Sequence, residues 1–263
     1  MRGRGLEYND LAPPMLEKIN HKSAPKEVIN ALVTLYHQGK YDDVLSRSSQ
    51  LIKEYPNTFV LHNIVGAISF EKGHKDVAIE HFRKVIELRP HHPHAYNNLG
   101  ATLINLGKYQ EAKSNLKKAI ELQPDYAEAY NNLGNVYKEM EEYNQAISVY
   151  EKAIELNPEY YEAYNNLGTA LKDQSKLDEA IEAYKMAIEI KPTYDEAYSN
   201  LGIILKGVAL KAPDVNLEDK LLYLLQQKTL VIPKEISRAI ISLVKFEPSI
   251  NYILHQASEP DFK

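Results

Sequence analysis

The sequence predicts an all-α protein, an α-solenoid in which helical hairpins stack one after another. Three regularities lead to this prediction: a proline, a glycine and an alanine each recur at intervals of 34 residues, and the block AYNNLG recurs at the same spacing. A fixed period of this length is typical of repeat proteins whose unit is a pair of helices. The recurring residues are Pro56, Pro90, Pro124, Pro158 and Pro192; Gly66, Gly100, Gly134, Gly168 and Gly202; and Ala78, Ala112, Ala146 and Ala180.

The first helix of each repeat carries its glycine in the helix interior. Glycine at such a position costs about 1 kcal/mol relative to alanine. A cost that recurs in every unit implies a gain that recurs too. We expect this gain to be a close approach of the paired helix, with the small residues Ala112, Ala146 and Ala180 on the other side.

The second helix of each repeat is amphipathic. In KYQEAKSNLKKAIEL the apolar residues recur at steps of three and four, which places Ala112, Leu116, Ala119 and Ile120 on one face. The proline that follows ends the helix, because proline cannot continue the hydrogen-bond ladder. A single hairpin leaves its apolar face in water, so neighbouring hairpins are expected to stack.

The composition is that of a protein that folds in water. Apolar residues make up 44% and charged residues 25% of the 263 residues, and no apolar run approaches the roughly 18 residues that span a bilayer. The net charge of -5 disfavours nonspecific binding to nucleic acid or anionic lipid. The absence of cysteine excludes disulfides and thiolate chemistry and suits a reducing compartment, so we expect a cytoplasmic protein.

The repeats resemble the tetratricopeptide repeat (TPR) family. The unit that begins at Ala127 carries the full family pattern in Tyr130, Leu133, Gly134, Tyr137, Ala146, Tyr150, Ala153 and Pro158. The resemblance implies a right-handed superhelix. The repeats are expected at residues 25–58, 59–92, 93–126, 127–160 and 161–194, with a half repeat at 195–207. The first repeat is degenerate, and residues 1–24 are expected to be a leading tail.

The segment after the repeats is expected to form further helices. Residues 208–263 contain LEDKLLYLLQQK and IPKEISRAIISLVKF, whose leucines and isoleucines recur at helical spacing. They are expected to cap the solenoid or to begin a further domain. The stretch IPKEISRAIISLVKFEP resembles the segment between a TPR array and an S-adenosylmethionine-dependent methyltransferase domain in some bacterial proteins. Similar arrays precede sulfotransferases and O-linked N-acetylglucosamine transferases, which implies that this array could be a non-catalytic arm of a transferase.

In the TPR family, the face of the first helix opposite the packed face lines a concave groove. On that face a ladder of one asparagine per repeat suits the amide backbone of an extended peptide, because each side chain offers donors and an acceptor. The alternative is that the asparagines are solvated or bond within the solenoid. The residues predicted to line the groove are Asn98, Asn132, Asn166 and Asn200, with Asn135, Thr169, Ile64 and Ala101.

The charges of this groove predict the chemistry of its partner. Carboxylates are expected in the lining and lysines at its flank, at Glu128, Glu139, Glu162, Asp173 and Glu196 and at Lys138, Lys172 and Lys206. A repeat that clamps an acidic tail needs cations in the lining itself. We therefore predict a protein partner with an extended segment of neutral or basic character. The alternative is a solvated acidic face.

The sequence does not indicate a metal site or an enzyme active site. The histidines His91, His92 and His94 fall in an expected turn without a neighbouring carboxylate or cysteine, so no metal site is predicted. Most of the 19 tyrosines occupy packed repeat positions, and no phosphate-binding or catalytic motif occurs. We predict no catalytic residue and no cofactor. The chain is expected to bind a protein, with a self-associating scaffold as the alternative and an enzyme as a remote third.

Overall fold

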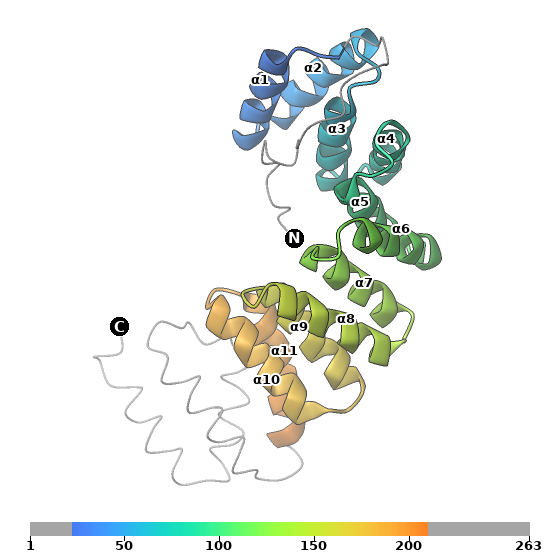
Figure 1. Ribbon diagram of the computed structural model, residues 1–263. Coiled ribbons are helices and arrows are strands. Elements are labelled where there is room, and N and C mark those ends of the chain that lie inside the picture. Colours follow the sequence, from blue (N-terminus) through green and yellow to red (C-terminus); the bar gives the residue numbers. More distant parts are fainter. Residues whose placement is uncertain (1–22, 210–263) are drawn as a thin grey trace, which may run out of the picture. The chain divides into compact units, whose positions relative to one another are not determined.

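The computed structural model describes residues 23–209, and every structural statement below refers to that range. It contains eleven α-helices and no strand between these limits, which confirms the all-α prediction (Figure 1). Most of the predicted tail at residues 1–24 lies outside the described residues. The helices predicted within residues 208–263 also lie outside the described residues. Of that segment the structure describes only residues 208 and 209, which end α11.

The helices alternate in role along the chain. Odd-numbered helices are the first of each repeat and are called A helices here, and even-numbered helices are the second and are called B helices. Their bounds are α1 Lys26–His37, α2 Tyr41–Glu54, α3 Phe59–Glu71, α4 Lys75–Leu88, α5 Pro93–Ile104, α6 Tyr109–Leu122, α7 Ala127–Glu139, α8 Tyr143–Leu156, α9 Tyr161–Asp173, α10 Leu177–Ile190 and α11 Asp195–Ala209.

The A helices α1, α3, α5, α7 and α9 each end in the same left-handed turn before the following B helix. The turn residue has a positive φ, and the next residue donates its backbone N–H to the carbonyl five residues earlier, as in a Schellman motif. In α1 this bond joins Lys40 to Leu35 at 3.0 Å. The five turn residues and their φ angles are Gly39 72°, Gly73 78°, Gly107 69°, Glu141 59° and Ser175 63°.

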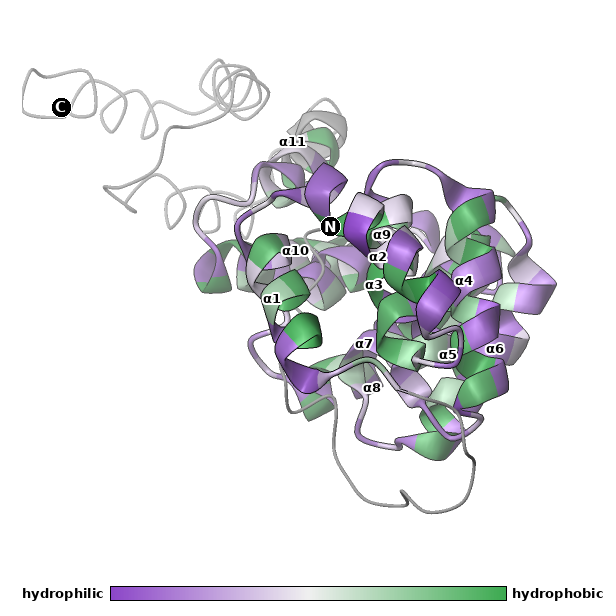
Figure 2. Cartoon of the chain, turned by 90° about the horizontal axis from the view of Figure 1, so that it is seen from above, coloured by the Kyte–Doolittle hydropathy of each residue, from purple (hydrophilic) through white to green (hydrophobic). Residues whose placement is uncertain are grey.

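The chain divides into two compact units. Unit 1 is Met1–Asn132 and unit 2 is Leu133–Lys263, so the boundary falls inside α7. Each unit is built from A and B helices with a buried face and an exposed face, and Figure 2 shows hydrophobic and hydrophilic residues on the same helices. The A helix α3 is an exception, because eight of its 13 residues are buried.

The recurring glycines allow a side chain of the B helix to lie against the backbone of the A helix. A Cβ added to Gly134 would lie 2.4 Å from Tyr150 Cε1, and one added to Gly168 would lie 2.8 Å from Tyr184 Cε1. The predicted close approach is therefore present. The prediction that alanines stand opposite the glycines was wrong.

Larger residues fill that place. Opposite Gly100 stands Leu116, whose Cγ would lie 2.6 Å from an added Cβ, and this residue comes four positions after the expected Ala112. The alanines Ala112, Ala146 and Ala180 are fully buried. A glycine leaves space beside the helix backbone, and a bulky side chain uses that space because it buries more apolar surface than alanine does.

The B helices end just before the recurring prolines, as predicted. The B helix α6 ends at Leu122, one residue before its C-cap Gln123, and Pro124 follows. The same order occurs at the end of α8, with Asn157 as the C-cap before Pro158. Among residues 23–209, no helix is long and apolar enough to cross a membrane.

Candidate functional site

The residues predicted to line a binding surface project from the A helices. In unit 1 these residues lie on α3, α5 and the first part of α7. In unit 2 they lie on the rest of α7 and on α9 and α11. We call these two surfaces the A-helix face of unit 1 and of unit 2 and describe them separately.

A buried asparagine organises the polar contacts of unit 1. The side chain of Asn97 is 0% exposed, and its Nδ2 donates to the Tyr126 hydroxyl at 3.2 Å and to Glu128 Oε1 at 3.0 Å. Its Oδ1 accepts a 2.9 Å bond from Asn132 Nδ2. All three partners belong to the junction with the next repeat or to that repeat itself, so Asn97 ties two repeats together.

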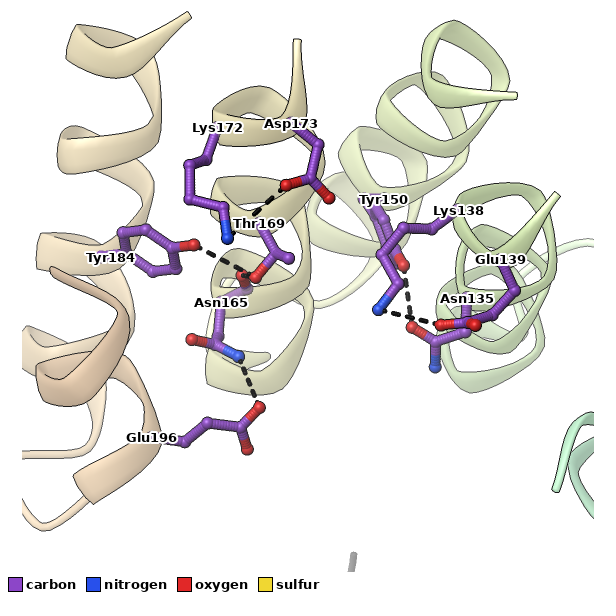
Figure 3. A network of polar contacts seen from close by, with 10 residues as sticks. All are labelled: Asn135, Lys138, Glu139, Tyr150, Asn165, Thr169, Lys172, Asp173, Tyr184 and Glu196. Carbon is purple, nitrogen blue, oxygen red and sulfur yellow. Dashed lines mark hydrogen bonds and ion pairs between the residues drawn. The ribbon is translucent and has the colours of Figure 1, made fainter. Parts of the chain in front are cut away.

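The same arrangement recurs two periods later in unit 2. Asn165 is also 0% exposed, its Nδ2 donates to Glu196 Oε1 at 3.2 Å, and its Oδ1 accepts from Asn200 Nδ2 at 2.9 Å. The Tyr194 hydroxyl donates to the other Glu196 oxygen at 3.0 Å. Figure 3 shows the contact between Asn165 and Glu196. The first asparagine of each Asn-Asn doublet is thus a structural tie that our sequence reasoning missed.

The second asparagine of each doublet is the one predicted to hold a peptide. Asn132 is only 5% exposed and Asn200 is half-buried, and the side-chain amides of both donate within the solenoid. For these two residues the alternative reading, bonding inside the protein, describes the structure. Asn166 is half-buried and also has an interaction partner. The half-buried Asn98 has no side-chain hydrogen bond to any described residue.

Ile64 does not belong to an accessible surface. It is 0% exposed and lies in a cluster with Ile29, Leu32 and Leu61, which joins the first hairpin to α3. The prediction that it offers an apolar contact to a partner was therefore wrong. The repeat of Ile64 carries isoleucine where the later repeats carry the second asparagine, and core packing fills this place. Ala101, by contrast, is half-buried on α5.

In unit 2, tyrosines from the B helices orient two predicted lining residues. The Tyr150 hydroxyl donates to Asn135 Oδ1 at 2.8 Å, and the Tyr184 hydroxyl lies 3.1 Å from Thr169 Oγ1 (Figure 3). Burial is the main cause that raises the pKa of Tyr184 to about 12 and the pKa of Tyr150 further. Both phenols therefore keep their protons at neutral pH.

The predicted flanking lysines pair with acids of their own helices. Lys138 Nζ lies 3.3 Å from Glu139 Oε1, and Lys172 Nζ lies 3.5 Å from Asp173 Oδ1. Figure 3 shows both pairs on the A-helix face of unit 2. Because each lysine is matched by a neighbouring carboxylate, the two pairs add no net charge to this face. The side chain of Lys206 lies outside the described part of the chain.

Two carboxylates of unit 2 have no cationic partner. Glu162 makes no ion pair or hydrogen bond with any residue in the described range, and Glu196 accepts only from the neutral donors Asn165 and Tyr194. In unit 1, Glu128 likewise accepts from the neutral amide of Asn97. The A-helix face of unit 2 therefore carries an excess of negative charge.

The cluster of histidines at residues 91–94 makes contacts with aromatic rings. The centre of the His92 ring lies 5.6 Å from that of Phe59 in a tilted arrangement and 5.6 Å from that of His94 in an edge-to-face arrangement. His94 Nδ1 lies 2.8 Å from the Tyr126 hydroxyl. Residues 23–209 contain no group of three or more side chains arranged to hold a metal ion.

These features define a repeat protein whose hairpins are tied by recurring glycine contacts and asparagine bonds. The chain belongs to the tetratricopeptide repeat family. Two models of that family, each described as tetratricopeptide repeat, match it over residues 93–159 and over residues 69–112 and 132–195. No curated protein matches the sequence.

Several solved structures share the fold. A crystal structure of MamA is 30% identical, with a TM-score of 0.56, and the match covers 63% of this chain and 96% of that chain. MamA from Desulfovibrio magneticus RS-1 is 25% identical with a TM-score of 0.57 over 65% and 96%. YrrB, described as a TPR protein with an unusual peptide-binding site, is 20% identical with a TM-score of 0.54 over 65% and 89%. Membership of the tetratricopeptide repeat family identifies the chain as a protein–protein interaction module.

Proposed function

We propose that the A-helix faces bind an extended segment of a partner protein with neutral or basic character. The observation that carries this proposal is the pair of carboxylates, Glu162 and Glu196, that form no ion pair with a cation in the described structure. Charges left unmatched on one surface favour a partner of opposite sign. An acidic segment would meet repulsion at this face.

Free amide groups supply the second part of the argument. The side-chain amide of Asn98 makes no hydrogen bond to the described residues, and Asn135 uses only its Oδ1, for Tyr150. Each of these residues can therefore donate to the carbonyl groups of an extended backbone. Such bonds hold a peptide without reading its sequence. Asn132 and Asn200 are expected to contribute indirectly, because their amides hold the repeats together.

Peptides that differ only in charge test this proposal. We expect a basic extended peptide to bind more tightly than a neutral one of the same length, and an acidic one to bind least, as measured by isothermal titration calorimetry. The double variant Asn98→Ala and Asn135→Ala removes the free amide from the A-helix face of each unit. It should therefore weaken binding of the basic and the neutral peptide alike, by about threefold or more on either face, since one backbone bond is lost there.

A matched control lies on a B helix. Ser148 is exposed on α8 and makes no hydrogen bond to the described residues, so Ser148→Ala should leave affinity unchanged. Tighter binding of the acidic peptide would contradict the charge preference. Equal affinity of the double variant and the native protein would contradict the role of the amides.

Self-association is a second candidate function, and an exposed isoleucine favours it. Ile203 on α11 is 59% exposed, which is unusual for a large apolar side chain in a repeat that is otherwise well packed. Light scattering of the native protein and of Ile203→Ser separates the two functions. A monomer at every concentration would exclude the scaffold, and an oligomer lost in Ile203→Ser would support it.

The role of a transferase arm remains a narrower proposal. The stretch at residues 232–248 that suggested it lies outside the described residues. A protein of this kind would present its bound segment to a catalytic domain supplied by the same or another chain. Co-purification of the array with a methyltransferase, and loss of methylation of the shared partner in the Asn98→Ala and Asn135→Ala variant, would support this role.

A further inference from the structure

In unit 2, two tyrosines hold the ammonium group of a lysine. Lys191 Nζ donates to the Tyr161 hydroxyl at 2.6 Å and lies 4.0 Å from the centre of that ring and 5.7 Å from the centre of the Tyr194 ring. The two rings meet edge to face at 4.9 Å. This geometry is that of a cation–π site, in which the faces of aromatic rings attract a positive charge.

The same arrangement occurs in unit 1, three periods earlier. There the guanidinium carbon of Arg89 lies 5.0 Å from the centre of the Phe59 ring, and the Phe59 and His92 rings are tilted against each other with their centres 5.6 Å apart. In the two repeats between them, the places of the first ring and the cation hold Pro93 with Gln123 and Ala127 with Asn157. Cation and ring thus occur together or not at all, which indicates that the ring is there for a cation.

The site in unit 2 differs from that in unit 1 by its acidic surroundings. Glu162 follows Tyr161 directly, and Glu196 accepts the hydrogen bond of the Tyr194 hydroxyl at 3.0 Å. Lys191 pairs with neither carboxylate, because its partners are the two rings and the Tyr161 hydroxyl. The place of Glu162 in unit 1 is taken by the apolar Val60. The single charge of Lys191 can offset only one of the two carboxylates, so the cluster in unit 2 keeps a net negative charge.

We propose that Tyr161, Tyr194, Glu162 and Glu196 form a subsite for a basic side chain of the bound segment, and that Lys191 occupies it until a partner displaces it. The inference rests on the proposed function and names the partner chemistry: an arginine or a methylated lysine. These cations hold their hydration water less tightly than a simple ammonium group, so they lose less when they enter an aromatic site.

The side chain of Lys191 can leave the site without a change in its helix. The residue is the C-cap of α10, so its backbone stands at a helix end, and its four-carbon side chain can swing into water. The helix N-termini at Tyr161 and Asp195 disfavour a cation, and the first-turn acids Glu162 and Glu196 offset this effect. The net attraction therefore depends on the carboxylates as well as on the rings.

The test compares three peptides that differ at one position: arginine, trimethyllysine or norleucine. Lys191→Met removes the resident cation, and we expect it to bind the two cationic peptides about three- to tenfold more tightly than the native protein does. Binding of the norleucine peptide should stay the same. Lys191→Arg refills the site and should retain native affinities.

A change of charge alone must be separated from an emptied site. Lys185→Met is the matched control, since Lys185 lies on the same helix and donates a hydrogen bond to Glu182. It should tighten binding of the cationic peptides less than Lys191→Met does. Glu162→Gln should weaken the cationic peptides severalfold and leave the norleucine peptide unaffected.

The outcomes distinguish the inference from the proposed function. If Lys191→Met only lowers the melting temperature, or changes affinity no more than Lys185→Met, the cation pair is a structural contact and the inference is wrong. Weaker binding by the Asn98→Ala and Asn135→Ala variant would still support the proposed function in that case. If none of the peptides binds the native protein, both are wrong.

Discussion

Asn97 and Asn98 are neighbours in α5 with opposite surroundings. Asn97 is fully buried and makes three side-chain hydrogen bonds, whereas the Asn98 amide is half-buried and bonds to no described residue. Successive residues of an α-helix project about 100° apart, so the two amides cannot serve the same surface. One stabilises the junction between repeats and the other remains available to a partner.

This difference predicts two distinct responses to the same substitution. Asn97→Ala should lower the free energy of unfolding by about 1–3 kcal/mol, because it leaves buried polar groups of its partners unsatisfied. Asn98→Ala should change it by less than about 0.5 kcal/mol. Urea unfolding followed by circular dichroism measures both. Since both variants exchange asparagine for alanine in one helix, equal losses would refute the distinction.

The roles of single residues were less predictable from the sequence than the helices or the fold. The recurring Asn-Asn doublet indicated that asparagine matters on the A helices, but helical spacing alone did not decide which member faces a neighbouring repeat. That choice depends on how each A helix lies against the next repeat. The same limit explains Ile64, which shares the register of Asn98 yet is buried because the first hairpin packs over it.

Helices α3 and α4 are joined by a pair of histidines. His62 Nδ1 lies 2.9 Å from His81 Nδ1, and His62 Nε2 lies 2.9 Å from the carbonyl oxygen of Pro56. A carbonyl accepts only, so His62 carries its proton on Nε2 and its Nδ1 accepts from His81. Burial is the main cause that lowers the pKa of both rings.

Neighbouring groups also act on the two pKa values, some lowering and some raising each one. Lys84 lowers the pKa of His62, while the Pro56 carbonyl, Glu80 and Glu87 raise it. The charge of His62 lowers the pKa of His81, and Glu80 raises it. In each case burial dominates, so both pKa values stay below the ordinary value of 6.5.

The direction of these shifts predicts that acid destabilises unit 1. Below pH 6.5 the unfolded chain takes up protons that the folded histidines resist, so the free energy of unfolding should fall between pH 7.5 and pH 5.5. Urea unfolding at the two pH values measures the fall. The double variant His62→Gln and His81→Gln should show a smaller fall, and His91→Gln, an exposed control, should behave as the native protein does.

The elements themselves follow from local rules that the sequence displays. Proline ends the B helices, and three of the five A–B turns carry glycine in the left-handed conformation. The residue that meets each A-helix glycine was not predictable in this way. A periodic pattern shows which side of a B helix is apolar, but the choice between Ala146 and Tyr150, one turn apart, depends on how far the two helices are offset.

The charge of the whole chain bears on how a partner is attracted. With 36 acidic and 31 basic side chains the net charge is -5, too small to dominate binding at a distance. The preference for a basic partner must therefore come from the unmatched carboxylates of the A-helix faces. The period of 34 residues and the composition were enough to predict the fold and its class of function, because both depend on the repeat and not on any one side chain.

Salt provides the corresponding test on the intact protein. Binding of a basic peptide should weaken severalfold as sodium chloride rises from about 0.05 M to about 0.5 M, since added ions screen exposed charges. A neutral peptide bonded through amide groups should lose little affinity. Calorimetry at several salt concentrations measures both. An equal loss for the two peptides would show that charge does not guide recognition.

Two of the left-handed turns offer positions where a substitution would stabilise the protein. Glu141 and Ser175 hold positive φ angles of 59° and 63°, where a side chain is strained by about 1–2 kcal/mol and glycine is not. Glycine also gains more entropy on unfolding than other residues do, which offsets part of this relief. Glu141→Gly and Ser175→Gly should therefore each raise the free energy of unfolding by a net of about 0.5–1 kcal/mol, measurable by urea unfolding. An engineer who wants a tougher scaffold for display of peptides could thus begin with two loop codons and leave the binding surface untouched.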